Sequence, residues 1–162
     1  MAQNVYVWIR GQNAGEVRGD STVSSMNREG SIEAFKFESQ VQIPRGGSGT
    51  AVGERSYGPI TITKRIDRSS PILHQILCNN ESIEVTLKFY RPNPSGDGTE
   101  EQFYTIRLRE GRISSIKTTS PNTVDSNTAS LPAMEEVSIV FGAITYIFES
   151  AGIEYEDQWN VA

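Results

Sequence analysis

Apolar and polar residues alternate with a period of two over most of this chain, and this pattern constrains its fold more than any other feature. In the run 82–91, the side chains of Ile83, Val85, Leu87 and Phe89 fall on one face. Such alternation is typical of a half-buried strand in an antiparallel sheet. The other runs that predict strands are 4–10, 31–43, 59–65, 101–110, 112–118, 136–142 and 143–149. About eight such strands favour an antiparallel β-barrel or a two-sheet sandwich.

Several details of the strand pattern are specific enough to compare with a structure. The run 31–43 predicts one continuous strand. Its predicted inner face carries Phe35, Phe37, Val41 and Ile43. Gly111 predicts a bend or bulge within a longer strand, and a change of phase near Gly142 predicts another bulge or turn. The polar segment 11–28 predicts a long loop.

One segment changes from the period of a strand to the period of a helix. Ser69 or Ser70 is the expected N-cap, and Pro71 suits the first helical turn. The apolar stripe that follows consists of Ile72, Leu73, Ile76 and Leu77. Burying such side chains is worth about 1.5–3 kcal/mol each, enough to dock a short helix that would not form alone. The sequence therefore predicts a single helix over about residues 70–79, packed against the β structure.

The composition excludes several classes of protein. The net charge is −5 with acids and bases interspersed, whereas nucleic-acid and polybasic membrane contacts favour clustered cations. The single cysteine excludes an internal disulfide framework and a thiolate metal cluster. The chain starts without a signal-peptide pattern and has no run of about 18 apolar residues. We expect one soluble domain, residues 1–162, made in the cytosol, with no nucleic-acid partner and no membrane insertion.

Residues that could carry chemistry are scarce. His74 is the sole histidine and Cys78 the sole cysteine. The sequence places no base, acid or metal ligand beside either in the pattern of a hydrolase or a metal site. The glycine-rich stretch GGSGTAVG lacks the Gly-Lys-Ser/Thr ending of a phosphate loop. We therefore predict no catalytic, cofactor-binding or metal-binding residues, and no enzymatic activity.

The helix and the strand before it carry a resemblance to a known family. The segment GPITITKRIDRSSPILHQIL resembles the central signature of the haemolysin-coregulated proteins (Hcp), the tube subunit of bacterial type VI secretion. The matching residues are Ile60, Thr61, Ile62, Thr63, Lys64, Asp67, Ser69, Ser70, Pro71 and Leu73. Flanking segments that agree are LKFYR at 87–91, GRISSI at 111–116 and EEVSIVFGAITYIF at 135–148. The stretch 17–26 departs from the pattern, but the resemblance covers nearly the whole chain.

The resemblance implies a structural function. Proteins of this family form hexameric rings with a wide central channel. The rings stack into a tube inside a contractile sheath, which drives the tube and its spike out of the cell, and the lumen can hold small effectors. Because this chain ends at Ala162, it resembles the form without a toxin domain. The resemblance implies a location in the cytoplasm before firing and outside the producing cell, or in a target cell, afterwards.

A ring subunit needs apolar side chains on strand faces that a monomer would leave wet. The candidates for subunit contacts are Tyr6, Trp8, Tyr90 and Phe103, together with Val140 and Ile147. The alternative is that these side chains cover the barrel under loops or under the helix. Both interpretations stay open on the sequence alone.

The polar segment 44–58 is the candidate assembly loop. It is long and rich in glycine, and structureless loops of this length in a small domain usually have a function. Its candidate contact residues are Arg45, Glu54, Arg55 and Tyr57. We expect them to contact neighbouring subunits or the next ring.

Two other classes of function remain as alternatives. A monomeric β-sandwich that binds a ligand such as carbohydrate would have an aromatic groove on one sheet and no large subunit interface. An enzyme would need a pocket that brings His74 together with acids or with Cys78.

Overall fold

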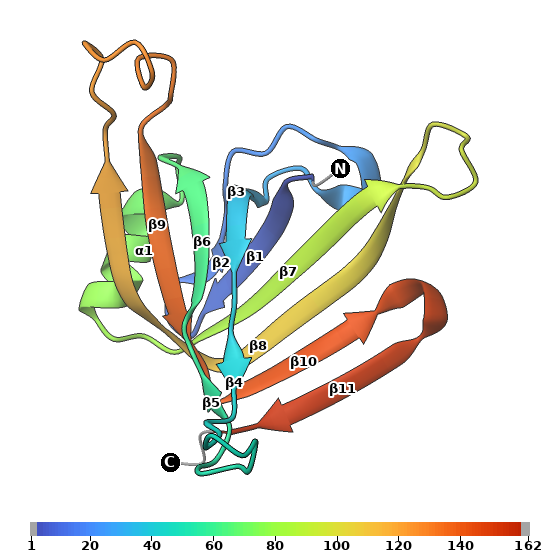
Figure 1. The fold of residues 1–162 in the computed structure, drawn as a ribbon. Helices are drawn as coiled ribbons and strands as arrows, with labels where there is room; N and C mark the ends of the chain where they lie inside the picture. The colour runs from blue at the N-terminus through green and yellow to red at the C-terminus, as the bar shows by residue number, and fades with distance from the viewer. Residues whose placement is uncertain (1–2, 160–162) are drawn as a thin grey trace.

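The computed structural model describes residues 3–159, which form an antiparallel β structure with one α-helix, α1 (Ser70–Cys78) (Figure 1). The strands are β1 (Val5–Gly11), β2 (Gly15–Val17), β3 (Ile32–Glu38), β4 (Val41–Gln42), β5 (Ser56–Tyr57), β6 (Ile60–Arg65), β7 (Ile83–Pro92), β8 (Glu100–Thr119), β9 (Met134–Val140), β10 (Ala143–Phe148) and β11 (Ile153–Gln158). Short 3-10 helices span Ser25–Asn27 and Glu149–Ala151. The predicted fold class, mainly antiparallel β with one helix, is confirmed.

The sheet closes on itself into a barrel. Neighbouring strands follow the order β8-β7-β1-β3-β6-β9, and β9 pairs again with β8. Every one of these pairs is antiparallel. β10 and β11 extend the sheet outward from the first half of β8. β8 therefore belongs both to the barrel wall and to the extension.

A bend lets β8 serve both partners. Glu110 has a φ of 53°, and the pairing with β7 shifts register between Ile83 and Val85. The next residue, Gly111, lies so close to β7 that an added Cβ would be 3.0 Å from the backbone oxygen of Ile83. Before the bend β8 pairs with β7 and β10, and after it with β9. The bend predicted at Gly111 is confirmed.

The core lies inside the barrel and under the helix. Its fully buried aliphatic side chains include Val7, Ile9, Ile32, Ile60, Ile62, Leu73, Ile76, Leu87, Leu108, Val137, Ile139 and Ile144. Leu73 and Ile76 come from α1, while Ile72 and Leu77 pack at its border. The predicted helix and its stripe are therefore confirmed.

The prediction of one strand over 31–43 is wrong. β3 ends at Glu38, and its pairing with β6 shifts register between Ala34 and Lys36. The bulge places Phe35 under the guanidinium of Arg65, 4.8 Å from its ring centre, whereas Phe37 packs against the core. The remaining two residues of the predicted inner face, Val41 and Ile43, are exposed. Here the chain leaves the barrel, because β4 pairs with β5 instead.

One loop prediction is wrong in part, and the bulge or turn predicted at Gly142 is confirmed. The segment 11–28 is not entirely loop, because β2 forms a hairpin with β1. Gly142 separates two strands with different partners, since β9 pairs with β6 and β8 while β10 pairs with β8 and β11. The predicted turn at Gly142 is thus a corner between the barrel and the sheet extension.

Within residues 3–159, no helix has the length and apolar character that crossing a membrane requires.

Candidate assembly site

The predicted structureless loop is an ordered hairpin. We define residues 41–57 as the projecting hairpin, because β4 and β5 form a two-stranded ribbon that leaves the lower end of the barrel in Figure 1. An isolated bridge joins Arg45 to Ala51. Backbone hydrogen bonds run from the N–H of Val52 to the oxygen of Pro44 and from the N–H of Gly46 to the oxygen of Thr50, at 2.9 and 2.8 Å. The tip is therefore held in a defined shape.

The base of the projecting hairpin is fixed to β11. Arg55 donates two hydrogen bonds to the carboxylate of Asp157, at 2.7 and 2.8 Å. Tyr57 donates to the same carboxylate at 2.7 Å, and its ring packs 5.4 Å from those of Phe141 and Trp159. The hairpin thus has an aromatic and ionic anchor.

The anchor shifts the pKa values of both acidic groups in it, the carboxyl of Asp157 and the phenol of Tyr57. The hydrogen bonds from Arg55 lower the pKa of Asp157, since they stabilise the carboxylate more than its desolvation opposes it. Burial, and then the hydrogen bond to Asp157, raise the pKa of Tyr57. At neutral pH the carboxylate is charged and the phenol keeps its proton, so the contacts hold together.

The four predicted loop residues therefore divide into two pairs. Arg55 and Tyr57 make contacts within their own chain at the base of the hairpin. Arg45 and Glu54 lie in the exposed part, where Arg45 donates to the backbone oxygen of Gly49 at 3.2 Å. A role in assembly stays a prediction for all four, and Arg45 and Glu54 have their charged groups at the surface.

The four strand residues predicted to make subunit contacts fall into a buried pair and a half-buried pair. Tyr6 and Tyr90 are buried edge to face, with ring centres 5.5 Å apart. The guanidinium of Arg28 covers both rings, at 4.9 and 4.2 Å, and forms a 2.8 Å ion pair with Glu100. Arg28, from the segment between β2 and β3, thus covers these two tyrosines within the monomer. Their proposed contact with another subunit stays untested.

Trp8 and Phe103 are only half-buried. The ammonium of Lys88 lies 4.5 Å from the Trp8 ring centre, and the guanidinium of Arg91 lies 4.8 Å from that of Phe103. Each ring therefore keeps exposed area beside a cation on the outer face of the sheet. These two residues suit a subunit contact better than the two tyrosines do.

Sequence reasoning missed a buried ion network beneath α1. The side chain of Lys64 is 0% exposed and that of Glu135 is 1% exposed. Their charged groups lie 2.5 Å apart, and Asp67 approaches the same ammonium at 3.0 Å. Two carboxylates and one ammonium thus share a site in which Lys64 and Glu135 are buried and Asp67 is largely so. The network joins β6, β9 and the segment that precedes α1.

The start of α1 is built into this network. Ser70 donates its hydroxyl hydrogen to Glu135 at 2.6 Å and accepts the backbone N–H of Asp67 at 3.0 Å. Asp67 in turn accepts the N–H of Ser69 at 2.9 Å, and the Ser69 hydroxyl as well. Ser69 is the N-cap, as predicted, but its side chain makes no capping bond to the helix. The serines connect the helix to the barrel instead.

A signal for this network was present in the sequence. Lys64 is in phase with Ile60 and Ile62 on β6, and Glu135 is in phase with Val137 on β9. A period of two therefore placed one cation and one anion on inner faces. Because a buried charge requires a partner, a contact between Lys64 and Glu135 could have been predicted from the sequence.

His74 and Cys78 are not brought into a site. Both are exposed on α1, and Nδ1 of His74 lies 2.7 Å from the backbone oxygen of Ser70. Within residues 3–159, no three or more His, Cys, Asp or Glu side chains are grouped so that they could hold a metal ion.

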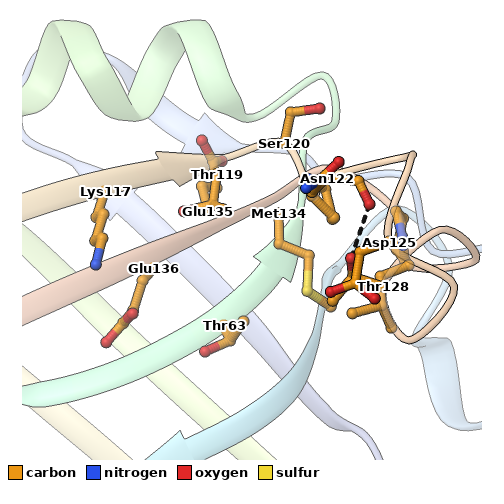
Figure 2. A pocket seen from close by; sticks show the side chains of 13 residues that line it. Thr63, Lys117, Thr119, Ser120, Asn122, Asp125, Thr128, Met134, Glu135 and Glu136 are labelled. Atoms are coloured by element: carbon orange, nitrogen blue, oxygen red, sulfur yellow. Dashed lines mark hydrogen bonds between the residues drawn. The ribbon is translucent and has the colours of Figure 1, made fainter.

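A cavity of about 470 Å³ lies on the outside of the barrel, where β6, β8 and β9 meet the segment 120–132 (Figure 2). Strand side chains in its wall include Thr63, Lys117, Met134 and Glu136. The segment opposite is ordered, because the hydroxyl of Thr128 donates to the backbone oxygen of Asn122 at 2.7 Å. We define this space as the outer cavity.

Comparison with known proteins agrees with the geometry. The family described as "Type VI secretion system effector, Hcp" matches residues 6–148. The major exported protein of Pseudomonas aeruginosa is 31% identical over 169 residues, which cover 99% of this chain and 97% of that protein.

Solved structures have the same fold. A crystal structure of an Hcp protein is 25% identical, with a TM-score of 0.87, and covers 99% of this chain and 100% of that one. A variant of the Hcp1 protein from the Escherichia coli EAEC 042 pathovar is 24% identical with a TM-score of 0.82, and the match covers 98% of this chain and 99% of that one. The chain described above belongs to the Hcp family of type VI secretion proteins.

Proposed function

We propose that this chain is a non-catalytic building block of the type VI inner tube, which forms hexameric rings that stack on one another. The observation that carries the proposal is the match to an exported Hcp relative over 99% of this chain and 97% of the relative. The residues 1–162 act as one Hcp-like domain in this proposal.

The surface of the monomer supports self-association. Trp8 and Phe103 are half-buried aromatic residues on the outer sheet, and buried aromatic side chains commonly anchor protein interfaces. The β10–β11 extension gives the sheet an open edge at β11, and an unpaired edge is a template for strand pairing with another chain. A head-to-tail contact that closes by rotation makes a ring.

The proposal includes partners and a location. The chain assembles in the cytoplasm and leaves the cell with the spike when the sheath contracts, so that it reaches the medium or a target cell. The lumen of the ring holds small effector proteins and keeps them stable. Secretion then depends on the sheath, while effector stability depends on the ring.

Native mass spectrometry at micromolar concentration tests the ring. We expect a species of six chains. A monomer at this concentration would contradict the proposal and would favour a monomeric binding module. Export is tested by measuring the protein in the culture medium. Deletion of the sheath should remove the protein from the medium but leave it in the cell pellet.

A further inference from the structure

We propose that Asp97, in the turn between β7 and β8, converts spontaneously to isoaspartate, and that the hydroxyl of Thr99 slows this conversion by binding the Asp97 carboxylate. In isoaspartate the backbone continues through the side-chain carbonyl carbon. The reaction takes place within one chain, so it does not depend on the proposed ring.

The sequence supplies both reacting groups at one place only. Asp97 precedes Gly98, and no other Asp or Asn of this chain precedes a glycine. The backbone nitrogen of Gly98 attacks the carboxyl carbon of the protonated Asp97 side chain. A C–N bond forms, the carboxyl C–OH bond breaks, and the hydroxyl leaves as water with the proton of that nitrogen. Water then opens the resulting succinimide at either carbonyl, which gives aspartate or isoaspartate without a net change in mass.

The turn brings the carboxyl group close to the nitrogen that attacks it. Oδ1 of Asp97 accepts the backbone N–H of Thr99 at 2.9 Å, so the side chain folds back along the peptide unit of Gly98. Gly98 has a φ of 82°, which costs a glycine little, and it has no side chain that would hinder the approach. All three residues are exposed at the upper end of the molecule in Figure 1. Proximity of this kind accelerates an intramolecular attack.

The hydroxyl of Thr99 acts in the opposite direction. It donates to the same Oδ1 of Asp97 at 2.5 Å. The hydrogen bonds from the hydroxyl and then from the backbone N–H of Thr99 lower the pKa of Asp97, because they stabilise the carboxylate. A carboxylate resists attack, since its oxygen cannot leave as water. The turn therefore places the carboxyl group correctly and keeps it in the unreactive form.

Conversion would change the start of β8. Isoaspartate adds one carbon atom to the backbone of a turn that is closed by the 2.8 Å bond from the N–H of Asn93 to the oxygen of Thr99. The next residue is Glu100, which holds Arg28 over the two buried tyrosines. Hydrogen exchange at residues 93–100 should therefore be faster in aged protein than in fresh protein. Unchanged exchange in converted protein would refute this effect.

Peptide mapping of aged full-length protein tests the site. We would incubate the protein at neutral pH for several weeks, folded and in denaturing urea, and digest it with trypsin. The peptide 89–107 contains Asp97. Chromatography separates its isomers, and electron-transfer fragmentation locates the additional backbone carbon. We expect isoaspartate at Asp97 in both samples, with the lower rate in the folded one. Its absence from both samples would overturn the site.

Asp125 is the internal control. It is exposed and accepts the backbone N–H of Asn127 at 2.9 Å, as Asp97 does from Thr99, but it precedes Ser126. The side chain of Ser126 hinders the attack, so isoaspartate at Asp125 should accumulate several-fold more slowly than at Asp97. Equal accumulation would mean that Gly98 gives no advantage and would overturn the choice of site.

Two substitutions of Thr99 test the protective contact. Thr99→Val keeps the shape and the backbone N–H but removes the hydroxyl, and should speed the conversion of folded protein several-fold. Thr99→Ser should keep the parent rate, and neither variant should lower the urea midpoint. In denaturing urea all three proteins should convert equally fast, because the contact is lost. Equal rates of folded Thr99→Val and parent would overturn the role of Thr99, and so would a difference that persists in urea.

Discussion

Two acid–base clusters in this chain lie in opposite environments. Lys64 and Glu135 are enclosed between the barrel and α1, with almost no exposed surface. Arg55, by contrast, is 41% exposed while it pairs with Asp157. The first cluster joins a helix to the core, and the second fixes a hairpin that projects into solvent. Burial makes the first a condition for folding, whereas exposure makes the second a means of positioning a surface element.

Removal of the cation from the buried cluster should cause the largest loss of stability. Lys64→Met leaves the carboxylates of Glu135 and Asp67 buried without their ammonium. We expect a loss of about 3–5 kcal/mol in the free energy of unfolding, measured by urea denaturation. The control is Lys36→Met, which breaks the exposed pair with Glu38 and should cost within about 1 kcal/mol. Equal losses would show that the buried network contributes no more than a surface pair.

The helix on top of the network should come next in size. Leu73→Ala removes a side chain with no exposed surface, so the cavity and the lost burial should lower the free energy of unfolding by about 2–5 kcal/mol. Gln75→Ala on the exposed side of α1 should change it by less than about 0.5 kcal/mol. Urea midpoints of both variants check this. A loss at Leu73 as small as that at Gln75 would mean that α1 is not docked as described.

The exposed cluster should respond to pH. The pKa of Asp157 is lowered in the folded chain, so its contribution to stability is present above the unfolded value of about 3.9 and disappears as the pH falls through the folded value. Asp157→Asn should therefore lower the urea midpoint at pH 7, by less than the two core variants. The gap between variant and parent should narrow below about pH 4. A gap that stays constant down to pH 3 would contradict an ionic role.

Removal of the hairpin tip should affect stability least. Deleting Gly46 to Glu54 takes away residues that are exposed, so the barrel should keep its urea midpoint while assembly is impaired in native mass and in export. A variant with nine Gly and Ser residues in the same place separates length from side chains and should also assemble poorly. Unfolding upon deletion would refute a pure assembly role, and normal assembly would refute any role.

Much of the fold could be read from local periodicity. The inner faces of β1, β6, β7 and β9, the span of α1 and the bend at Gly111 all follow from patterns within about ten residues. The prediction of one strand over 31–43 was wrong because the alternation of apolar and polar residues continues past Glu38, although the chain leaves the barrel there. A period of two reports which face a residue occupies and carries no information on which strand lies beside it.

Only part of the candidate assembly site could be predicted from the sequence. Sequence composition singled out the segment that forms the projecting hairpin, but not its anchor on Asp157, which is 102 residues from Arg55. It singled out Tyr6 and Tyr90 as outward-facing, but not the guanidinium of Arg28 that covers them. Contacts between distant segments leave no local pattern, and the sequence therefore could not rank these residues.

The sequence by itself determined most strands of the barrel wall, the helix and the side of those strands that faces the core, because side-chain direction follows from backbone geometry. Lys64 and Glu135 are in phase with the inner residues of β6 and β9, a signal that the sequence predictions did not use. Only the tertiary structure decided that β8 closes the barrel by pairing with β7 and β9, and that Lys64 meets Glu135, 71 residues further along the chain. The physical reason is that pairing depends on which distant segments come together, and the burial of a charge becomes tolerable only when its opposite arrives in the same place.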